Sequence, residues 1–267
     1  MKNLIIVMGI FVSFFSTSSV VAKEGFPGRA EFPEIPIYSK ADLAKNFNDV
    51  VIVDSRSALE FETLRIKDAV NISVANRDFG TKIKALRNKT KKKIVFYCNG
   101  RSCFKSYKAA KAAMKNGVSN VVAYDAGVFE WAETYPKRAV LLGENPIDTS
   151  KIISKSKFKS RLIHPKAFTE TVRSIPRKEF MVMDVRDMYQ RAGISYFPGM
   201  EKWVSLDDKK KLIKYLNKAK DKNKTLYIYD EAGKQVRWLQ YTLERENIKN
   251  YFFMAKGAKG FAQTFIN

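Results

Sequence analysis

The 267-residue chain contains only two cysteines and a single histidine. One histidine cannot provide a set of imidazole ligands, and the cysteines lack the spacings of a zinc site, so we expect no metal and no other cofactor. Acidic residues are also scarce, with 27 against 49 Lys and Arg, which gives a formal charge of +22. This charge favours small anions, acidic proteins and anionic membrane surfaces as partners, and the absence of a binding motif argues against nucleic acid.

Long apolar runs are missing beyond the amino terminus. A short apolar run at residues 4–15 follows Lys2, and small residues continue to Ala22. This pattern is typical of a secretory signal peptide at residues 1–22, cleaved after Ala22. It predicts a periplasmic or secreted protein with no transmembrane segment after cleavage. The alternative is an uncleaved anchor, although the run is short for a membrane span of about 20 residues.

Continuous apolar runs alternate with helical segments along the rest of the chain. The runs "VVIVD" at residues 50–54 and "IVFY" at residues 94–97 fit buried strands of a parallel sheet. A helix rich in good formers follows at residues 105–117 and ends at Gly117. The same order returns later, with strand-like runs "FMVMD" and "TLYIY". The repeat predicts two homologous α/β domains, each a parallel β-sheet flanked by helices.

The landmark residues of the repeat have similar spacings in both copies. Asp54 and Cys98 are 44 residues apart, and Asp184 and Asp230 are 46 residues apart. We therefore place the domains and the segments beside them at residues 23–35 (lead-in), 36–141 (first domain), 142–157 (linker) and 158–267 (second domain).

Cys98 follows the strand expected at residues 94–97 and precedes a helix, which is where α/β sheets place their active sites. Free loop amides and the helix dipole favour negative charge there, so we predict a lowered pKa and a standing Cys98 thiolate at neutral pH. The positive charges of Arg101 and Lys105 also favour a lowered pKa of Cys98. The intervening Asn99, Gly100 and Ser102 suit a tightly curved backbone.

The whole arrangement resembles a tandem rhodanese, a sulfurtransferase. The resemblance rests on "VDSRSALEF", "VFYCNGRSCFKSYKAA" and "YDAGVFEW" in the first domain and on "MDVRDMY" and "YDEAGKQVRW" in the second. It implies that Cys98 is the catalytic residue and carries sulfur as a persulfide. It also implies that the loop binds a small anionic donor such as thiosulfate, through Asn99, Gly100, Arg101, Ser102, Cys103, Phe104 and Lys105.

The resemblance further implies a sulfur acceptor, and it implies that only the first domain is catalytic. The acceptor is cyanide or a thiol, including a thiol of a partner protein. Asp54 and Arg56 match a signature that braces the domain through an ion pair. Asp230 occupies the cysteine position of the second domain, and because a carboxylate cannot carry sulfane sulfur, we expect that domain to be inactive.

The role of Cys103 leaves more than one reaction open for the loop. A disulfide to Cys98 would close a very small loop and give little entropic stabilisation, so a purely structural disulfide is disfavoured. Cys103 is either a bystander or a second thiol that attacks an oxidised or persulfidated Cys98. The alternatives to sulfur transfer are a thiol–disulfide oxidoreductase using both cysteines and a non-enzymatic sulfur carrier or binding module. A phosphatase is disfavoured because Phe104 occupies the position of its arginine.

Overall fold

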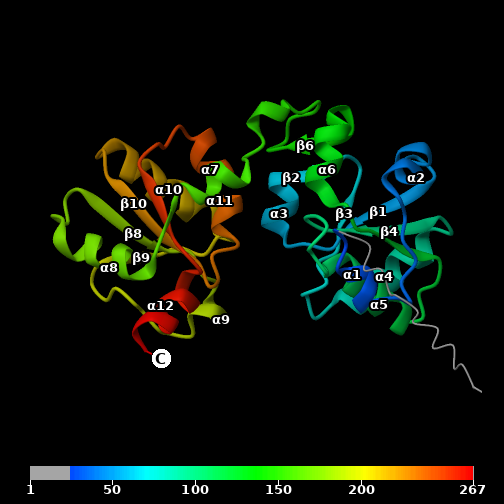
Figure 1. Ribbon diagram of the computed structural model, residues 1–267, viewed down its shortest axis with the longest axis horizontal. Coiled ribbons are helices and arrows are strands. Elements are labelled where there is room, and N and C mark those ends of the chain that lie inside the picture. The colour runs from blue at the N-terminus through cyan, green and yellow to red at the C-terminus, as the bar shows by residue number, and fades with distance from the viewer. Residues whose placement is uncertain (1–24, 267) are drawn as a thin grey trace, which may run out of the picture.

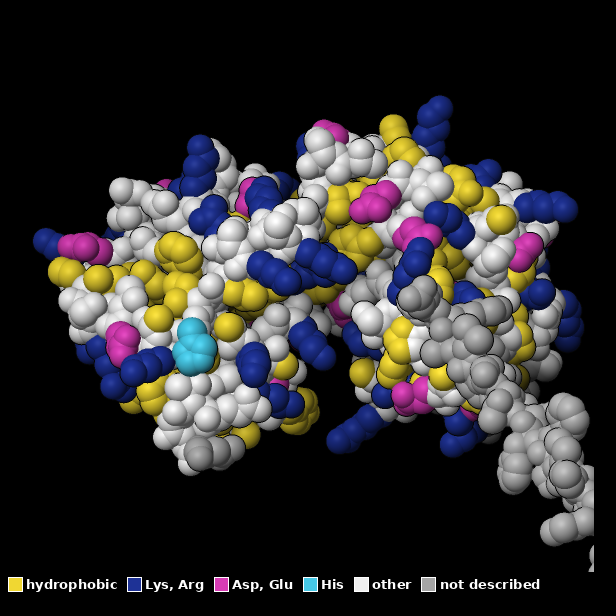
Figure 2. Space-filling model, viewed as in Figure 1, with side chains coloured by type: hydrophobic (Ala, Val, Ile, Leu, Met, Phe, Trp, Pro, Cys, Tyr) yellow, Lys and Arg dark blue, Asp and Glu magenta, His cyan; other side chains and the backbone are white. Residues whose placement is uncertain are grey.

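The computed structural model describes residues 25–266, which form two α/β halves that lie side by side (Figure 1). The predicted signal peptide at residues 1–22 lies outside the described residues. Within the described part of the chain, no helix combines the length and the apolar character needed to cross a membrane. Lys and Arg side chains are spread over both halves on the face seen in Figure 2.

The first half is built on four parallel strands in the order β3-β1-β4-β5. Asp54 and Tyr97 are partners at the ends of β1 and β4, so both strands end at the same edge of the sheet. A separate antiparallel pair, β2 with β6, has no counterpart among the strands expected from the sequence. The strands are β1 Val50–Asp54, β2 Leu64–Ile66, β3 Val70–Asn71, β4 Lys93–Tyr97, β5 Val121–Tyr124 and β6 Ala139–Leu141.

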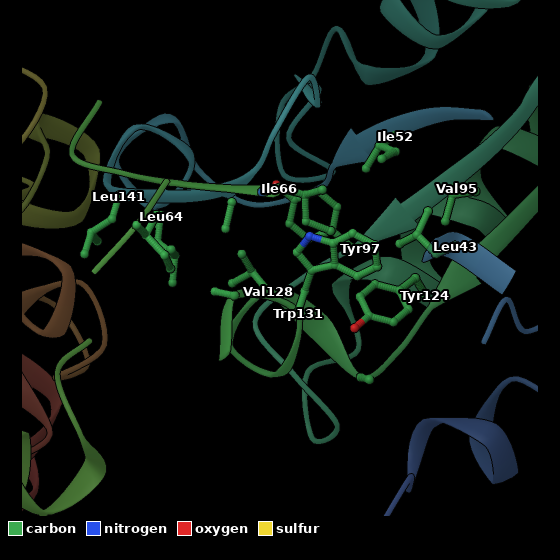
Figure 3. Packing of buried hydrophobic residues seen from close by; sticks show 14 of the residues in the cluster. Leu43, Ile52, Leu64, Ile66, Val95, Tyr97, Tyr124, Val128, Trp131 and Leu141 are labelled. Atoms are coloured by element: carbon green, nitrogen blue, oxygen red, sulfur yellow. The ribbon is translucent and has the colours of Figure 1, made fainter. Parts of the chain in front are cut away.

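Helices cover both faces of this first sheet. Along β4, Ile94 and Phe96 point into a buried cluster with α4 and α5, whereas Val95 and Tyr97 point into one with α2 and α6 (Figure 3). Burial on both faces explains why the strand is apolar from Ile94 to Tyr97. The helices are α1 Gly28–Glu31, α2 Lys40–Lys45, α3 Ala58–Thr63, α4 Phe79–Lys89, α5 Lys105–Lys115 and α6 Gly127–Thr134, with a 3-10 turn at Pro136–Arg138.

The second half contains five parallel strands in the order β7-β11-β10-β8-β9. Helices α10 and α11 cover one face, and α8 and α12 cover the other. The strands are β7 Leu162–Ile163, β8 Phe180–Asp184, β9 Glu201–Trp203, β10 Thr225–Tyr229 and β11 Tyr251–Met254. The helices are α7 Lys155–Lys159, α8 Pro165–Ser174, α9 Met188–Arg191, α10 Lys209–Asp221, α11 Val236–Arg245 and α12 Gly257–Phe265, with a 3-10 turn at Thr149–Lys151.

The predicted α/β fold class, with two parallel sheets flanked by helices, is confirmed. The two halves also pack against each other. Trp238 of α11 stacks on Phe129 of α6, with ring centroids 5.4 Å apart, and the Arg56 guanidinium lies 5.1 Å from the Trp238 ring. Beside this contact lies a cavity of about 730 Å³ lined by residues of both halves.

Candidate active site

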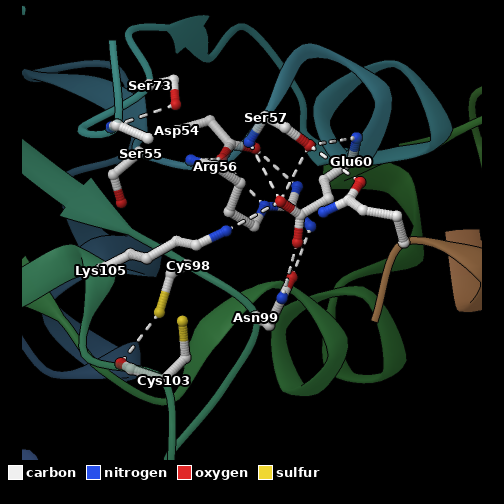
Figure 4. A network of polar contacts seen from close by, with 12 residues as sticks. Asp54, Ser55, Arg56, Ser57, Glu60, Ser73, Cys98, Asn99, Cys103 and Lys105 are labelled. Atoms are coloured by element: carbon white, nitrogen blue, oxygen red, sulfur yellow. Dashed lines mark hydrogen bonds and ion pairs between the residues drawn. The ribbon is translucent and has the colours of Figure 1, made fainter. Parts of the chain in front are cut away.

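Cys98 directly follows β4, the strand between β1 and β5. Its side chain is fully buried, and its Sγ donates a hydrogen bond to the carbonyl oxygen of Cys103 at 3.0 Å (Figure 4). The hydroxyl of Ser106, in the first turn of α5, lies 3.8 Å from the same sulfur. Cys98 therefore lies between the end of a central strand and the start of a helix, where the sequence places it.

Cys103 lies at the outer side of the same loop. Its side chain is half-buried and lines the cavity between the two halves. Both cysteines are free thiols, and among residues 25–266 no group of His, Cys, Asp or Glu side chains could hold a metal ion. A hydrogen bond from the Cys98 thiol lowers the pKa of Cys103 to about 6, against the effect of burial, and the Lys105 amide adds to this lowering. The lowered pKa favours the thiolate form of Cys103.

The predicted Cys98 thiolate is wrong for this arrangement. Burial raises the pKa of Cys98 well above the usual thiol range. The amides of Gly100 and Ser106 do favour an ionised sulfur, as the loop-and-helix argument predicts, but they do not offset the loss of hydration. The neighbouring Cys103 is less deeply buried than Cys98, and the hydrogen bonds that it receives lower its pKa.

A buried ion pair between Asp54 and Arg56 supports the loop that follows Cys98. Arg56 contacts Asp54 with an Nη2–Oδ2 distance of 2.6 Å, and both side chains are fully buried. The other arm of the guanidinium donates from Nη1 to Oδ1 of Asn99 at 2.9 Å. The bracing ion pair implied by the resemblance is therefore present, and it also fixes the first residue after Cys98.

Glu60 is a site residue that the sequence analysis missed. Its carboxylate accepts hydrogen bonds from Nδ2 of Asn99 at 2.8 Å and Nζ of Lys105 at 3.0 Å. Burial disfavours the charge of Glu60, but the charges of Lys105 and Arg56 and these hydrogen bonds outweigh it and lower its pKa to about 2. Its only signal in the sequence is its place in the capping box with Ser57, which explains the helix start but not the contact with the loop.

The two basic residues predicted to dock a donor are both engaged in ion pairs. Lys105 contacts Glu60 at 3.0 Å, and Arg101 contacts Glu130 at 2.9 Å. Phe104 packs edge-on against Phe32. The predicted loop residues that do line the cavity are Asn99, Gly100, Arg101, Ser102 and Cys103, whereas Cys98, Phe104 and Lys105 are not part of its lining.

Arg237 of α11 lines the same cavity from the second half. Its guanidinium carbon lies 4.5 Å from the centroid of the Phe129 ring, and its Nε is buried without a hydrogen-bond partner in the described residues. Burial lowers the pKa of this guanidinium. No local pattern marks Arg237, because only the packing of the two halves brings it to the cavity.

A close backbone contact fixes the far side of the loop. The amide of Val128 donates to the carbonyl of Cys98 at 3.0 Å. Gly127 has φ +79°, and a Cβ there would lie 2.3 Å from the backbone nitrogen of Gly100. The turn before α6 therefore packs directly on the loop and requires glycine.

Asp230 occupies the matching position after β10, and its carboxylate is wrapped by its own loop. Backbone amides of Ala232, Gly233, Gln235 and Val236 all donate to it. The second half also repeats the buried ion pair as Asp184 with Arg186, at 2.8 Å. The amides that could bind an external anion are thus occupied by Asp230 itself.

Comparison with known proteins gives a match to the family model described as rhodanese-like domain over residues 39–134. A tRNA uridine(34) hydroxylase from Cytophaga hutchinsonii is 36% identical over 88 residues, which are 33% of this chain and 28% of that protein. Two solved structures are also similar. A thiosulfate sulfurtransferase from Pseudomonas aeruginosa has 14% identity and a TM-score of 0.40, covering 86% of this chain and 42% of that one. A human single-domain sulfurtransferase has 24% identity and a TM-score of 0.31, covering 37% and 96%.

The match to the family model falls on the stretch that contains Cys98, its loop and the Asp54–Arg56 ion pair. It lies entirely in the first half, so a second rhodanese-like domain stays a prediction. The chain spans less than a third of the length of the hydroxylase that it resembles. Residues 39–134 of this chain are therefore similar to a rhodanese-like domain.

Proposed function

We propose that the rhodanese-like domain is a sulfurtransferase and that Cys98 carries the sulfur as a persulfide. The main support is the position of Cys98 between β4 and α5, where the amides of Gly100 and Ser106 favour an ionised sulfur. Amides in this position stabilise the anionic outer sulfur of a persulfide. The relative named a hydroxylase aligns over only 88 residues, so the cysteine loop rather than that name is the basis of the proposal.

The reaction begins with ionisation of Cys98. Its proton passes to the Cys103 thiolate, whose lowered pKa makes it the base of the loop. Cys98 then attacks the outer sulfur of a donor such as thiosulfate, and as the new sulfur–sulfur bond forms, the old one breaks and sulfite leaves with the electron pair. In the second step cyanide or a thiol takes the outer sulfur, which regenerates the Cys98 thiolate.

Access to Cys98 depends on the segment that covers it. Cys103 is held over Cys98 by the bond from Cys98 Sγ to its carbonyl and by its own amide, which donates to Gly100 at 2.8 Å. Displacement of this short segment opens a path from the cavity to the buried sulfur. We propose that donor binding requires this displacement.

Arg237 is the side chain that we propose for docking the anionic donor. Arg101 and Lys105 already neutralise carboxylates, whereas the charge of Arg237 faces the cavity beside an aromatic ring and forms no ion pair within residues 25–266. A sulfonate or carboxylate in the cavity would supply the missing partner.

The proposal includes the predictions on the second domain, the linker and the signal peptide. We propose that residues 158–267 form an inactive rhodanese-like domain, which lacks the cysteine and closes the cavity from the other side. The first domain at residues 36–141 is then joined to it by the linker at residues 142–157. We also propose, from the sequence alone, that the signal peptide directs the protein to the periplasm or the outside of the cell.

The test is thiocyanate production from thiosulfate and cyanide by the purified protein. We expect more than one thiocyanate per protein molecule, and an intact mass increased by one sulfur atom when cyanide is left out. Cys98→Ser should produce no thiocyanate above background. Met114→Ser is the matched control, because it removes a sulfur atom at an exposed position of α5 outside the site.

Two outcomes would contradict the proposal in different ways. Thiocyanate at the wild-type rate from Cys98→Ser would end the assignment of Cys98. Persulfide formation without turnover would instead favour the non-enzymatic sulfur carrier.

A further inference from the structure

The two thiols of the loop differ in depth. Cys103 lines the cavity between the two halves, whereas Cys98 is fully covered and is not part of the cavity lining. Figure 4 shows both side chains on the same loop, with the Cys98 sulfur directed at the Cys103 segment. A small molecule that enters the cavity therefore meets Cys103 before Cys98.

The two thiols also differ in charge. The hydrogen bond from Cys98 lowers the pKa of Cys103 to about 6, whereas burial raises the pKa of Cys98. In thiol–disulfide exchange the thiolate is the attacking species, and a second thiol within reach releases the mixed disulfide that forms. The accessible sulfur is thus the reactive one, and the covered sulfur lies directly behind it.

We propose that Cys103 and Cys98 form a dithiol pair that exchanges with small disulfides, in which Cys103 attacks and Cys98 resolves. This activity is separate from sulfur transfer and does not depend on it.

The exchange needs no reactant beyond the small disulfide. The Cys103 sulfur attacks one sulfur of R–S–S–R, a new sulfur–sulfur bond forms, and the first R–S⁻ leaves. Cys98 then attacks the Cys103 sulfur, the bond from Cys103 to the second R–S group breaks, and that group takes the Cys98 proton and leaves as R–SH. The small disulfide is reduced to two thiols while the protein dithiol is oxidised to a Cys98–Cys103 disulfide. The same two steps in reverse, driven by two small thiols, restore the dithiol.

The loop favours a reversible bond over a permanent one. Only four residues separate the cysteines, and the Cys103 amide already closes a turn on the Gly100 carbonyl. Such a small ring restricts the unfolded chain little, so the disulfide gains little stability from chain entropy. Oxidation also occupies Cys98, so the disulfide form cannot accept sulfane sulfur.

The test follows the intact mass of the reduced protein with bis(2-hydroxyethyl) disulfide at neutral pH. The wild type should lose two hydrogens and release two equivalents of 2-mercaptoethanol. Cys98→Ser should accumulate a mixed disulfide on Cys103. Cys103→Ser should form a mixed disulfide on Cys98 at least about tenfold more slowly, because that thiol is covered and protonated.

A measurement on the wild type tests the proposal even if the variants do not fold. Limited alkylation with iodoacetamide followed by peptide mapping should modify Cys103 first, with a rate that is half-maximal near pH 6. Prior oxidation by the disulfide should block alkylation of both cysteines, and a small thiol should restore it.

Three results would overturn the proposal. They are faster mixed-disulfide formation in Cys103→Ser than in Cys98→Ser, a wild type that stays a stable mixed disulfide, and a wild type that iodoacetamide alkylates but the disulfide does not oxidise. A thiocyanate assay on the same reduced samples separates this proposal from sulfur transfer, since either activity can be present without the other.

Discussion

At the scale of single residues, the active-site loop depends on a carboxylate outside it. Glu60 accepts from Asn99 and Lys105, and Arg56 donates to the same Asn99. The residue that follows Cys98 is therefore held from two sides by groups of opposite charge. This arrangement holds the start of the cysteine loop and Lys105 in place.

The ionisation of Glu60 links this network to pH. The pKa of its carboxyl is 4.5 in the unfolded chain and about 2 in the folded protein, so the charged group stabilises the fold above pH 4.5. That contribution is lost as the pH falls from 4.5 through 2. At about 1.4 kcal/mol for each pKa unit, it amounts to about 3 kcal/mol.

We expect Glu60→Gln to lower the free energy of unfolding at pH 7 by about 3 kcal/mol and to flatten the loss of stability between pH 4.5 and 2. Urea denaturation at a series of pH values measures both effects. Glu62→Gln is the control, because Glu62 lies in the same helix and its ion pair with Lys209 is exposed. Equal pH profiles for the wild type and Glu60→Gln would contradict the role of this carboxylate.

At the scale of elements, the turn between β5 and α6 supports the cysteine loop. Gly127 approaches the backbone of Gly100 so closely that a Cβ would overlap it, at 2.3 Å. Gly117, at the end of α5, has a similar φ of +76° but has open space around the Cβ position. Alanine substitutions at these two glycines therefore distinguish the destabilisation caused by positive φ from the destabilisation caused by steric overlap.

Gly117→Ala should lower stability by about 1 to 2 kcal/mol, because alanine is unfavourable at positive φ. Gly127→Ala should cost about 1 to 3 kcal/mol more, because the new methyl group displaces the loop. Urea denaturation gives the stabilities, and thiosulfate-dependent mass shifts show whether Cys98 still accepts sulfur. Equal stabilities of the two variants would mean that the Gly127 turn does not constrain the loop.

At the scale of the whole molecule, the two halves together make the cavity. The first half contributes the cysteine loop and Phe129, and the second half contributes Arg237. The second half has an aspartate where a cysteine would be needed and nevertheless adds a positive charge to the site. We infer that its contribution to sulfur transfer is donor binding.

We expect Arg237→Met to raise the KM for thiosulfate by about tenfold to a hundredfold with a smaller change in kcat, because a charge-assisted hydrogen bond contributes about 1.5–3 kcal/mol. Steady-state thiocyanate production at varied thiosulfate concentrations measures this split. Lys234→Met is the control, since Lys234 is an exposed cation near the same helix. The same KM in both variants would remove Arg237 from donor binding.

Most of the fold could be predicted from the sequence because its signals are local. The runs "VVIVD", "IVFY", "FMVMD" and "TLYIY" are apolar at nearly every position, and each proves to be a strand buried on both faces. The antiparallel pair of β2 and β6 was not predictable in this way, because three-residue strands carry too short a pattern.

The sequence by itself determined the α/β class, the repeat, and the position of Cys98 between a strand and a helix. These depend on the order of apolar runs, helix formers and glycines along the chain. Only the tertiary structure decided which thiol carries the charge, because burial removes water from Cys98 and leaves Cys103 at a cavity. It also decided that Glu60 and Glu130 pair with the cations of the loop, whereas Arg237 lines the cavity and forms no ion pair within residues 25–266. Solvation and charge pairing are set by neighbours in space, and a sequence pattern does not contain them.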